Sequence, residues 1–219
     1  GKGTSFEGNE YFEGPSIRYI NDKYYLVYSS VNTHQLCYAV SEKPMEGFTY
    51  GGVIVSNGDV GYQGRKEEDK LMSVGNNHGG LVCVNDQWYI FYHRHTNGTW
   101  YSRQGCAEKL HMNPDGSFEQ AELTSCGLNG GPLPGKGVYP AYIACRLFTD
   151  QPSVYVDGDK YPRVMQDGKD GDEEQGYIAN IKDSTTIGFK YFDMKNVHGM
   201  RITTRGYGDG TFQIKTAWD

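Results

Sequence analysis

The residue best suited to acid–base chemistry is Glu13, which stands in the run Tyr11-Phe12-Glu13-Gly14-Pro15. Two aromatic side chains flank its carboxyl, and neighbours that exclude water suit a carboxyl that acts as a general acid. Glu13 also comes just before a strand-like segment, so we expect it at a strand end. The competing interpretation is an ordinary solvated glutamate in a loop.

A second candidate is His78, in the run Asn76-Asn77-His78-Gly79-Gly80. The sequence around it matches the sequence around Glu13 at an offset of 64 to 65 residues. The two residues are therefore expected at the same level of two equivalent structural units. Small and amide neighbours leave room beside the imidazole for a ligand, a water molecule or a metal ion. A purely structural histidine is an equal alternative.

An internal repeat supplies the elements that would position these residues. Residues 16–28 match residues 80–92, and each copy contains a strand, an Asn-Asp turn and an aromatic-rich strand. Both turn residues tolerate positive φ, which suits a tight hairpin. Two more strands are expected after each hairpin, at 35–40 and 51–56 in the first copy and at 100–107 and 117–124 in the second. A repeated four-stranded antiparallel unit is typical of a β-propeller blade.

The chain beyond the repeat reads differently. Gly- and Pro-rich residues 127–134 indicate a boundary. Short strands expected at 176–180, 185–192, 199–205 and 211–217 favour a β-sandwich, or jelly roll, of which only part is present. We therefore predict an all-β protein with about two propeller blades at 1–133, a linker at 134–153 and a truncated sandwich at 154–219. Two blades cannot close a ring, so the chain is expected to be part of a longer protein.

Composition narrows the possible ligands. The net charge is −6 with no basic stripe, so nucleic acid is not an expected partner. No run of 18 apolar residues exists, so no transmembrane helix is expected. The chain has 18 Tyr, 9 Phe, 3 Trp and 30 Gly, which favours strands and tight turns. Aromatic faces among neutral polar groups are what sugar-binding surfaces need.

Three segments together resemble glycoside hydrolase family 43: residues 11–17, 76–80 and 88–95. The resemblance spans about residues 6–133. It implies a five-bladed propeller that removes arabinofuranose or xylose units from plant polysaccharides by single displacement with inversion. By this resemblance Glu13 is the general acid, with Phe12 beside it as a substrate contact. It also implies that His78 lies on the propeller axis and holds calcium or water, and that Arg103 binds the sugar.

The same resemblance implies a catalytic base and a further carboxylate that modulates the acid, both Asp from earlier blades. We find no substitute here, because Asp22 and Asp86 fall in hairpin turns and Asp59 and Asp69 in a polar loop. An inverting hydrolase needs two carboxyl groups across the sugar. The chain alone is therefore expected to be inactive.

The second half resembles carbohydrate-binding module family 6, at residues 176–180, 188–193 and 205–210. This likeness implies that Tyr177 is a stacking platform for a sugar ring. A plain structural tyrosine is the alternative.

The sequence thus predicts part of a hydrolase that cleaves terminal α-L-arabinofuranosyl or β-D-xylosyl linkages in xylan-type polysaccharides of the plant cell wall. Such a substrate favours export from the cell, and calcium is the only cofactor implied. The alternative is a non-catalytic glycan-binding protein, which would retain the sugar without releasing pentose.

Overall fold

The computed structural model describes residues 1–150, 161–168 and 176–216. Within these ranges every regular element is a β-strand or a single turn of 3₁₀ helix, which confirms the all-β class. The 3₁₀ turns are η1 (Asn57–Asp59), η2 (Tyr62–Gly64), η3 (Glu67–Asp69), η4 (Gly127–Asn129) and η5 (Ala141–Ile143). In the part of the chain that the structure describes, no helix is long and apolar enough to cross a membrane.

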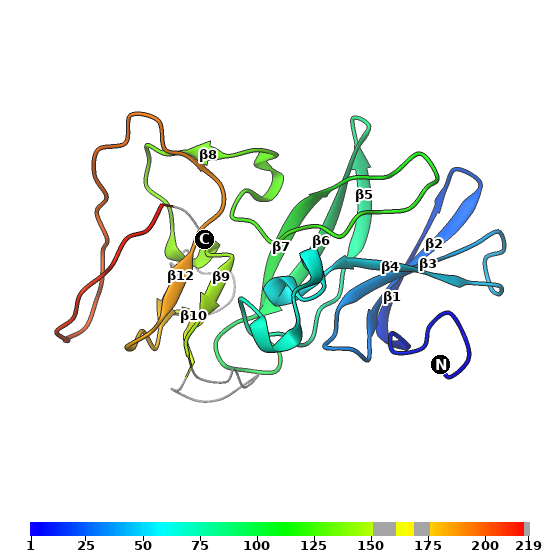
Figure 1. Cartoon of the computed structure of the whole chain (residues 1–219), viewed down its shortest axis with the longest axis horizontal. Coiled ribbons are helices and arrows are strands. Elements are labelled where there is room, and N and C mark those ends of the chain that lie inside the picture. Colours follow the sequence, from blue (N-terminus) through cyan, green and yellow to red (C-terminus); the bar gives the residue numbers. More distant parts are fainter. Residues whose placement is uncertain (151–160, 169–175, 217–219) are drawn as a thin grey trace.

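The first repeat copy forms a four-stranded antiparallel sheet (Figure 1). Its strands are β1 (Tyr11–Ile20), β2 (Lys23–Ser30), β3 (Leu36–Ser41) and β4 (Thr49–Val55), in that spatial order. This is the meander expected of one propeller blade. All four expected strands are confirmed.

The second copy forms a three-stranded antiparallel sheet of β5 (Gly80–Val84), β6 (Gln87–His95) and β7 (Arg103–Leu110). The fourth strand expected at 117–124 is absent. That segment makes one isolated bridge, between Met112 and Phe118, and the Ala121 amide donates to the Ile54 carbonyl of β4. The segment therefore bonds briefly to the residues that follow β7, through the Glu119 amide and the His111 carbonyl, and then to the neighbouring sheet, without forming a strand.

Both Asn-Asp hairpins form as predicted. The four turn residues have positive φ, with values of 48° at Asn21, 61° at Asp22, 49° at Asn85 and 60° at Asp86. Two consecutive left-handed residues are the pattern of a type I′ turn, whose twist matches that of the flanking strands. The turns therefore set the register that repeats between the sheets.

The main core lies between the two sheets. The first sheet contributes residues such as Tyr25, Val27 and Tyr38, and the second contributes Leu81 and Ile90. Alternate residues of each strand face this core, as the period of two requires. Burial of these large side chains fixes the two sheets relative to each other.

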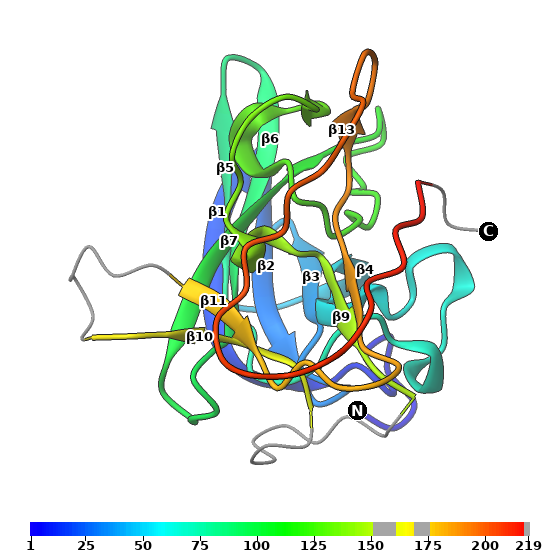
Figure 2. The same cartoon turned by 90° about the vertical axis from the view of Figure 1, so that its left-hand side faces the viewer.

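The remaining strands are short, and several pair with segments far away in sequence. These are β8 (Leu133–Pro134), β9 (Arg146–Phe148), β10 (Arg163–Gln166), β11 (Gly176–Ala179), β12 (Thr186–Gly188) and β13 (Phe192–Asp193). β10 and β11 form a hairpin, β12 pairs with β9, and β13 pairs with β8 in parallel. Figure 2 shows these segments passing over one side of the blades.

The expected sandwich does not close within the described residues. Residues 194–216 contain no strand, so the strands expected at 199–205 and 211–216 do not form. β12 and β13 instead complete sheets with segments before residue 150. The boundaries at 133/134 and 153/154 stay a prediction; the second boundary falls within residues 151–160, outside the described part.

A buried ion cluster joins distant parts of the chain. The Lys190 Nζ lies 3.2 Å from Asp59 Oδ2 and 2.7 Å from Glu122 Oε1. Lys190 and Asp59 are 3% and 1% exposed. The Asp59 Oδ1 also accepts a hydrogen bond from the Leu123 amide at 2.7 Å. The C-terminal segment is thereby linked to the segments that follow β4 and β7.

Candidate functional site

The candidate residues Glu13, His78 and Arg103 lie at one end of the two blades. β1 and β5 begin at this end, and the β2–β3 and β6–β7 loops lie there too, because neighbouring strands are antiparallel. Glu13 lies near the start of β1, and His78 two residues before β5. The repeat therefore places these two side chains at equivalent positions, as the sequence predicts.

A bulge in β1 directs the Glu13 side chain. The pairing of β1 with β2 shifts register between Tyr11 and Glu13 and again between Glu13 and Ser16. Gly14 lies within this irregular stretch with a φ of 67°, a conformation that favours glycine. Bulges turn side chains away from the regular alternation. The Glu13 side chain consequently stays 38% exposed at the blade end.

His78 lies directly against Glu13. Its Nε2 is 3.0 Å from Glu13 Oε1, within ion-pair distance. Gly14 makes this approach possible, because a Cβ at that position would lie 2.7 Å from His78 Cδ2. The sequence-predicted pair is therefore brought together, and the glycine between Glu13 and Pro15 is a steric requirement.

His93, in β6, holds His78 from behind. The backbone amide of His78 donates to His93 Nε2 at 3.2 Å, and the two rings pack edge to face with centroids 5.3 Å apart. The His93 amide in turn faces the Asn77 Oδ1 at 3.4 Å. Because Nε2 accepts a hydrogen bond, the proton of the neutral imidazole must reside on Nδ1. Burial, together with nearby Arg103, lowers the pKa of His93 to about 4.

Arg103 begins β7 opposite His95 of β6. Its Nη1 lies 3.1 Å from His95 Nδ1 and donates to the Ser102 carbonyl at 3.2 Å. Burial, followed by the Arg103 charge, lowers the pKa of His95 to about 4, so this imidazole is neutral near pH 7. Burial lowers the pKa of Arg103 itself, and the Glu13 carboxylate opposes that shift. Arg103 thus supplies a fixed positive charge within electrostatic reach of Glu13.

Sequence reasoning missed His34, in the β2–β3 loop. Its Nδ1 lies 3.9 Å from Glu13 Oε1, and its ring packs edge-on against Phe12 with centroids 4.9 Å apart. Phe12 and Tyr11 are half exposed, so they do not enclose the carboxyl as expected. Imidazoles flank it instead. No sequence pattern identifies His34, because the repeat offset of 64 to 65 residues matches it with Gly98 or Thr99.

Tyr177 has a different environment. It lies in β11, and the Arg205 guanidinium sits 3.7 Å from the centre of its ring. Arg205 also pairs with the Asp167 carboxylate through both of its terminal nitrogens. One face of the ring is therefore covered by a cation in this structure. Its role as a sugar platform stays a prediction.

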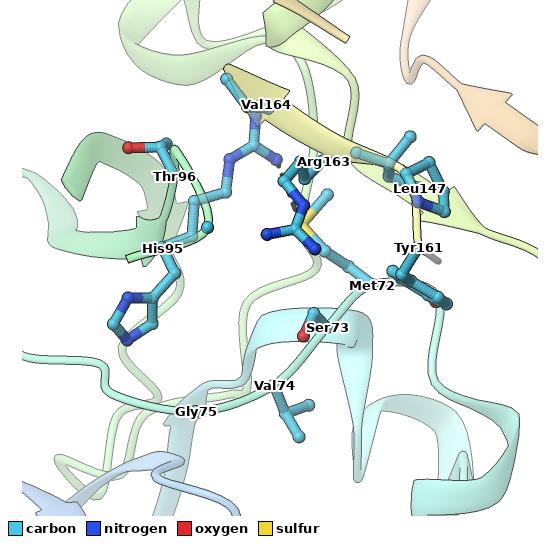
Figure 3. Close-up of a pocket in the computed structure, with 13 residues that line it drawn as sticks. Met72, Ser73, Val74, Gly75, His95, Thr96, Leu147, Tyr161, Arg163 and Val164 are labelled. Atoms are coloured by element: carbon cyan, nitrogen blue, oxygen red, sulfur yellow. Dashed lines mark hydrogen bonds between the residues drawn. The ribbon is translucent and has the colours of Figure 1, made fainter. Parts of the chain in front are cut away.

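A small cleft of about 50 Å³ lies between the end of β6 and β10 (Figure 3). It is bounded by the loop at Met72–Gly75, by His95 and Thr96 at the end of β6, and by Arg163 and Val164 of β10. A space of this size admits a few water molecules and no sugar. The candidate site is thus the open surface around Glu13.

The described residues include no group of three or more His, Cys, Asp or Glu side chains that could hold a metal ion. Calcium prefers six to eight oxygen ligands. His78 offers a nitrogen, and that nitrogen already faces Glu13. The residues described here do not fit a calcium site by themselves.

The candidate site is thus an exposed carboxyl with an imidazole 3.0 Å away, at the end of two repeated β-sheets. Residues 2–118 match the family model "Glycosyl hydrolases family 43". The chain belongs to that family.

The proteins that are similar to this chain in sequence are named as xylosidases or arabinosidases. The chain is 56% identical over 225 residues to a xylosidase/arabinosidase of Thermoclostridium stercorarium, covering 100% of this chain and 48% of that protein. It is 32% identical over 113 residues to a beta-xylosidase of Xylanibacter ruminicola, covering 51% and 31%. A crystal structure of a GH43_1 enzyme from Xanthomonas citri is 29% identical, covers 52% and 31%, and has a TM-score of 0.41. The chain spans about half the length, or less, of these curated relatives.

Proposed function

We propose that this chain supplies the acid half of the active site of an inverting glycoside hydrolase that cleaves terminal α-L-arabinofuranosyl or β-D-xylosyl linkages. The observation that carries the proposal is the 3.0 Å approach of His78 Nε2 to Glu13 Oε1 at the exposed blade end. The names of the relatives, which cover xylosidases and arabinosidases, support the substrate class.

In this mechanism Glu13 donates its proton to the oxygen of the leaving sugar as the glycosidic bond breaks. His78 holds the carboxyl in place, and Gly14 lets the two side chains meet. Arg103 binds sugar hydroxyl groups with its remaining N–H donors, because a guanidinium presents several N–H groups in a fixed fork. Neutral His93 and His95 support the other two groups without adding charge.

Inversion also requires a base that activates water on the opposite face, roughly 6.5–9.5 Å from the acid. The carboxylates considered from sequence are not suited to that role. Asp22 is in a hairpin turn at the far end of the blade, and Asp59 is buried against Lys190. We propose that the base comes from another part of the full-length protein and that the 219 residues alone do not turn over pentosides. Hydrolysis by the isolated chain that disappears in Glu13→Gln would contradict this.

The decisive experiment compares pentose release from xylo-oligosaccharides and arabinoxylo-oligosaccharides with nitrophenol release from nitrophenyl xyloside and arabinofuranoside by the full-length protein. We expect Glu13→Gln to lower kcat for the oligosaccharides, whose leaving group is a poorly acidic sugar hydroxyl, by roughly 10²–10⁴-fold, the usual contribution of general acid catalysis. A substrate with a very acidic leaving group should be affected least, since it needs little protonation. An equal loss of kcat for substrates with good and with poor leaving groups would show that Glu13 is not the acid.

Three finer assignments belong to the same proposal. The calcium site expected at His78 needs oxygen ligands from water or from other segments of the full-length protein, because the described residues place no group of three or more potential metal ligands around this imidazole; calorimetric titration of the chelator-treated full-length protein with Ca²⁺ tests it. The second half, including Tyr177, is proposed to bind xylan-type glycans in the manner of a carbohydrate-binding module. The substrate, a plant cell-wall polysaccharide, favours an extracellular location.

The competing function is glycan binding without catalysis. The exposed aromatic residues around the site favour it. A protein of this kind would retain xylo-oligosaccharides and release no pentose.

A further inference from the structure

The strand β6 continues beyond the point where its neighbour β5 begins. Pairing between the two strands stops at Gly80, which lies opposite Phe91. Among the described strands, His93 therefore has a partner only on the β7 side, where it lies opposite Gly105. Backbone N–H and C=O groups that are removed from water need partners. The groups that bond to His93 on its open side thus decide how firmly this end of β6 is held.

Two buried side-chain amides take the place of the missing strand. The Asn57 Nδ2 donates to the His93 carbonyl at 3.3 Å, and the His93 amide donates to the Asn77 Oδ1 at 3.4 Å. Asn57 and Asn77 are only 3% and 1% exposed. A buried amide that loses its partner is costly, so these contacts are strongly favoured. Because Asn57 follows β4 and Asn77 precedes β5, each blade contributes one of the two amides.

His93 passes this placement on to the candidate acid. Its Nε2 accepts a hydrogen bond from the His78 amide at 3.2 Å, and the His78 Nε2 lies 3.0 Å from Glu13 Oε1. Each contact in this series depends on direction as well as distance. A displacement of the His93 ring would therefore move the His78 backbone, and with it the imidazole that meets Glu13.

We infer that Asn57, Asn77 and His93 are positioning residues for the general acid, which fix His78 and, through it, the Glu13 carboxyl in place for proton transfer. This inference rests on the proposed function, since it takes Glu13 to be the acid. Two amides that only complete the hydrogen bonds of a strand end are the alternative, and the two roles predict different kinetics.

The first test compares two kinds of substrate in the full-length protein. For Asn77→Leu and for Asn57→Leu we expect kcat for pentose release from xylo-oligosaccharides to fall by roughly tenfold to 10²-fold, because a displacement near 1 Å can have this effect. The kcat for nitrophenyl xyloside should change far less, since its leaving group needs little protonation. If both rates fall by the same factor, the amides have only a structural role and the inference is overturned.

Gln87→Leu is the matched control for the two asparagine variants. Gln87 also donates a side-chain amide hydrogen bond to a strand carbonyl, that of Leu110 at 2.9 Å, but it lies at the opposite end of β6. We expect this variant to lower the unfolding free energy without changing the ratio of the two kcat values. A ratio that changes in Gln87→Leu as much as in Asn77→Leu would contradict the inference.

A matched pair at position 93 keeps the test sharp if the asparagine variants fold poorly. The amide oxygen of a glutamine side chain can accept a hydrogen bond as Nε2 does, whereas leucine offers no acceptor. We expect His93→Leu to lower kcat selectively for xylo-oligosaccharides and His93→Gln to restore most of it. Equal kcat values in His93→Leu and the wild type would overturn the inference.

A spectroscopic measurement separates this inference from the proposed function. The His93 Nδ1 has no hydrogen-bond partner among the described residues, so the His78 amide alone holds the proton of the neutral ring on Nδ1. In full-length protein labelled with ¹⁵N-histidine, we expect the Nδ1–H form of His93 in the wild type and its loss in Asn77→Leu. An Nε2–H form in the wild type overturns the inference whatever Glu13 does. If the Nδ1–H form is lost as expected but Glu13→Gln affects good and poor leaving groups equally, the acid role of Glu13 fails and the placement of His78 by His93 stands.

Discussion

Gly14 is the single residue on which the candidate acid depends most. Its φ of 67° and the 2.7 Å distance from a built Cβ to His78 Cδ2 act together. We expect Gly14→Ala to push His78 away from Glu13 and to lower kcat about 10²-fold, the effect that a displacement near 1 Å can have on positioned groups. Steady-state kinetics of pentose release from xylo-oligosaccharides, whose leaving group needs protonation, would measure this.

Gly64→Ala is the matched control for Gly14→Ala. Gly64 has a φ of 78°, and a Cβ there would meet no atom within 4 Å. Both variants incur similar backbone strain, about 1–2 kcal/mol. If both variants lose the same fraction of kcat for the same loss of unfolding free energy, the contact between Gly14 and His78 has no special role in the site.

Sequence reasoning found the central pair of the site for a physical reason. A repeat places residues at equivalent levels, so the offset between its two copies is enough to match Glu13 with His78. His34 and His93 escaped because their roles depend on side-chain direction. A loop conformation turns His34 toward the carboxyl, and a cross-strand contact places the His93 ring behind His78. Neither leaves a motif in the sequence.

At the scale of elements, Glu108 of β7 couples the blade to the irregular segment that follows it. The Thr124 amide and hydroxyl donate to its two carboxylate oxygens at 2.7 and 2.6 Å, and Tyr92 donates at 3.3 Å. Burial nonetheless raises the pKa of Glu108 from 4.5 to about 7. The folded protein therefore holds a proton here that the unfolded chain has released between these pH values.

The consequence is a pH dependence of stability with a defined sign. Because the folded state binds more protons at Glu108, the contribution of Glu108 to the free energy of unfolding should fall as pH rises from about 4.5 to 7 and then level off, by about 3 kcal/mol at most. Glu108→Gln keeps an acceptor for the Thr124 amide and should remove this dependence. Denaturant unfolding of the wild type and of Glu108→Gln at pH 5 and pH 8 measures the Glu108 contribution as the difference between the two proteins. The opposite contributions of His93 and His95 are the same in both proteins and cancel in that difference.

Exposed Glu119 offers a control for the Glu108 measurement. Glu119→Gln should leave the pH dependence of unfolding as it is in the wild type, since this side chain is in solvent. A Glu108→Gln protein whose free energy of unfolding changes between pH 5 and pH 8 by the same amount as that of the wild type would contradict the assignment of the effect to Glu108.

Elements were predictable where local pattern and turn chemistry agree. The two Asn-Asp hairpins and the strands of both blades follow from alternation and positive-φ residues. The strand predicted at 117–124 was wrong, because the apolar residues of this segment are buried between the two sheets rather than within one sheet. Ala121 bonds to Ile54 of the other blade, a contact that no local sequence signal specifies.

At the scale of the whole molecule, the Lys190 cluster decides whether the C-terminal segment belongs to the blade structure or moves independently. The two carboxylates that meet Lys190 come from segments 131 and 68 residues away in sequence. Lys190→Met removes the cation and leaves Asp59, which is 1% exposed, without its partner. We expect the unfolding free energy of the full-length protein to fall by about 3–5 kcal/mol, the usual cost of breaking a buried pair from one side.

A triple variant separates loss of the ion pair from loss of packing. Lys190→Met with Asp59→Asn and Glu122→Gln carries no unpaired charge, and the amide oxygen at position 59 can still accept from the Leu123 amide. Replacing a whole buried ion cluster by neutral groups of similar size is often neutral for stability. We therefore expect the triple variant to recover most of the loss and to unfold in one transition. If Lys190→Met instead leaves the blades unchanged and releases only residues after 150 to early proteolysis, the C-terminal segment is an independent module, as the sequence-based domain boundaries suggest.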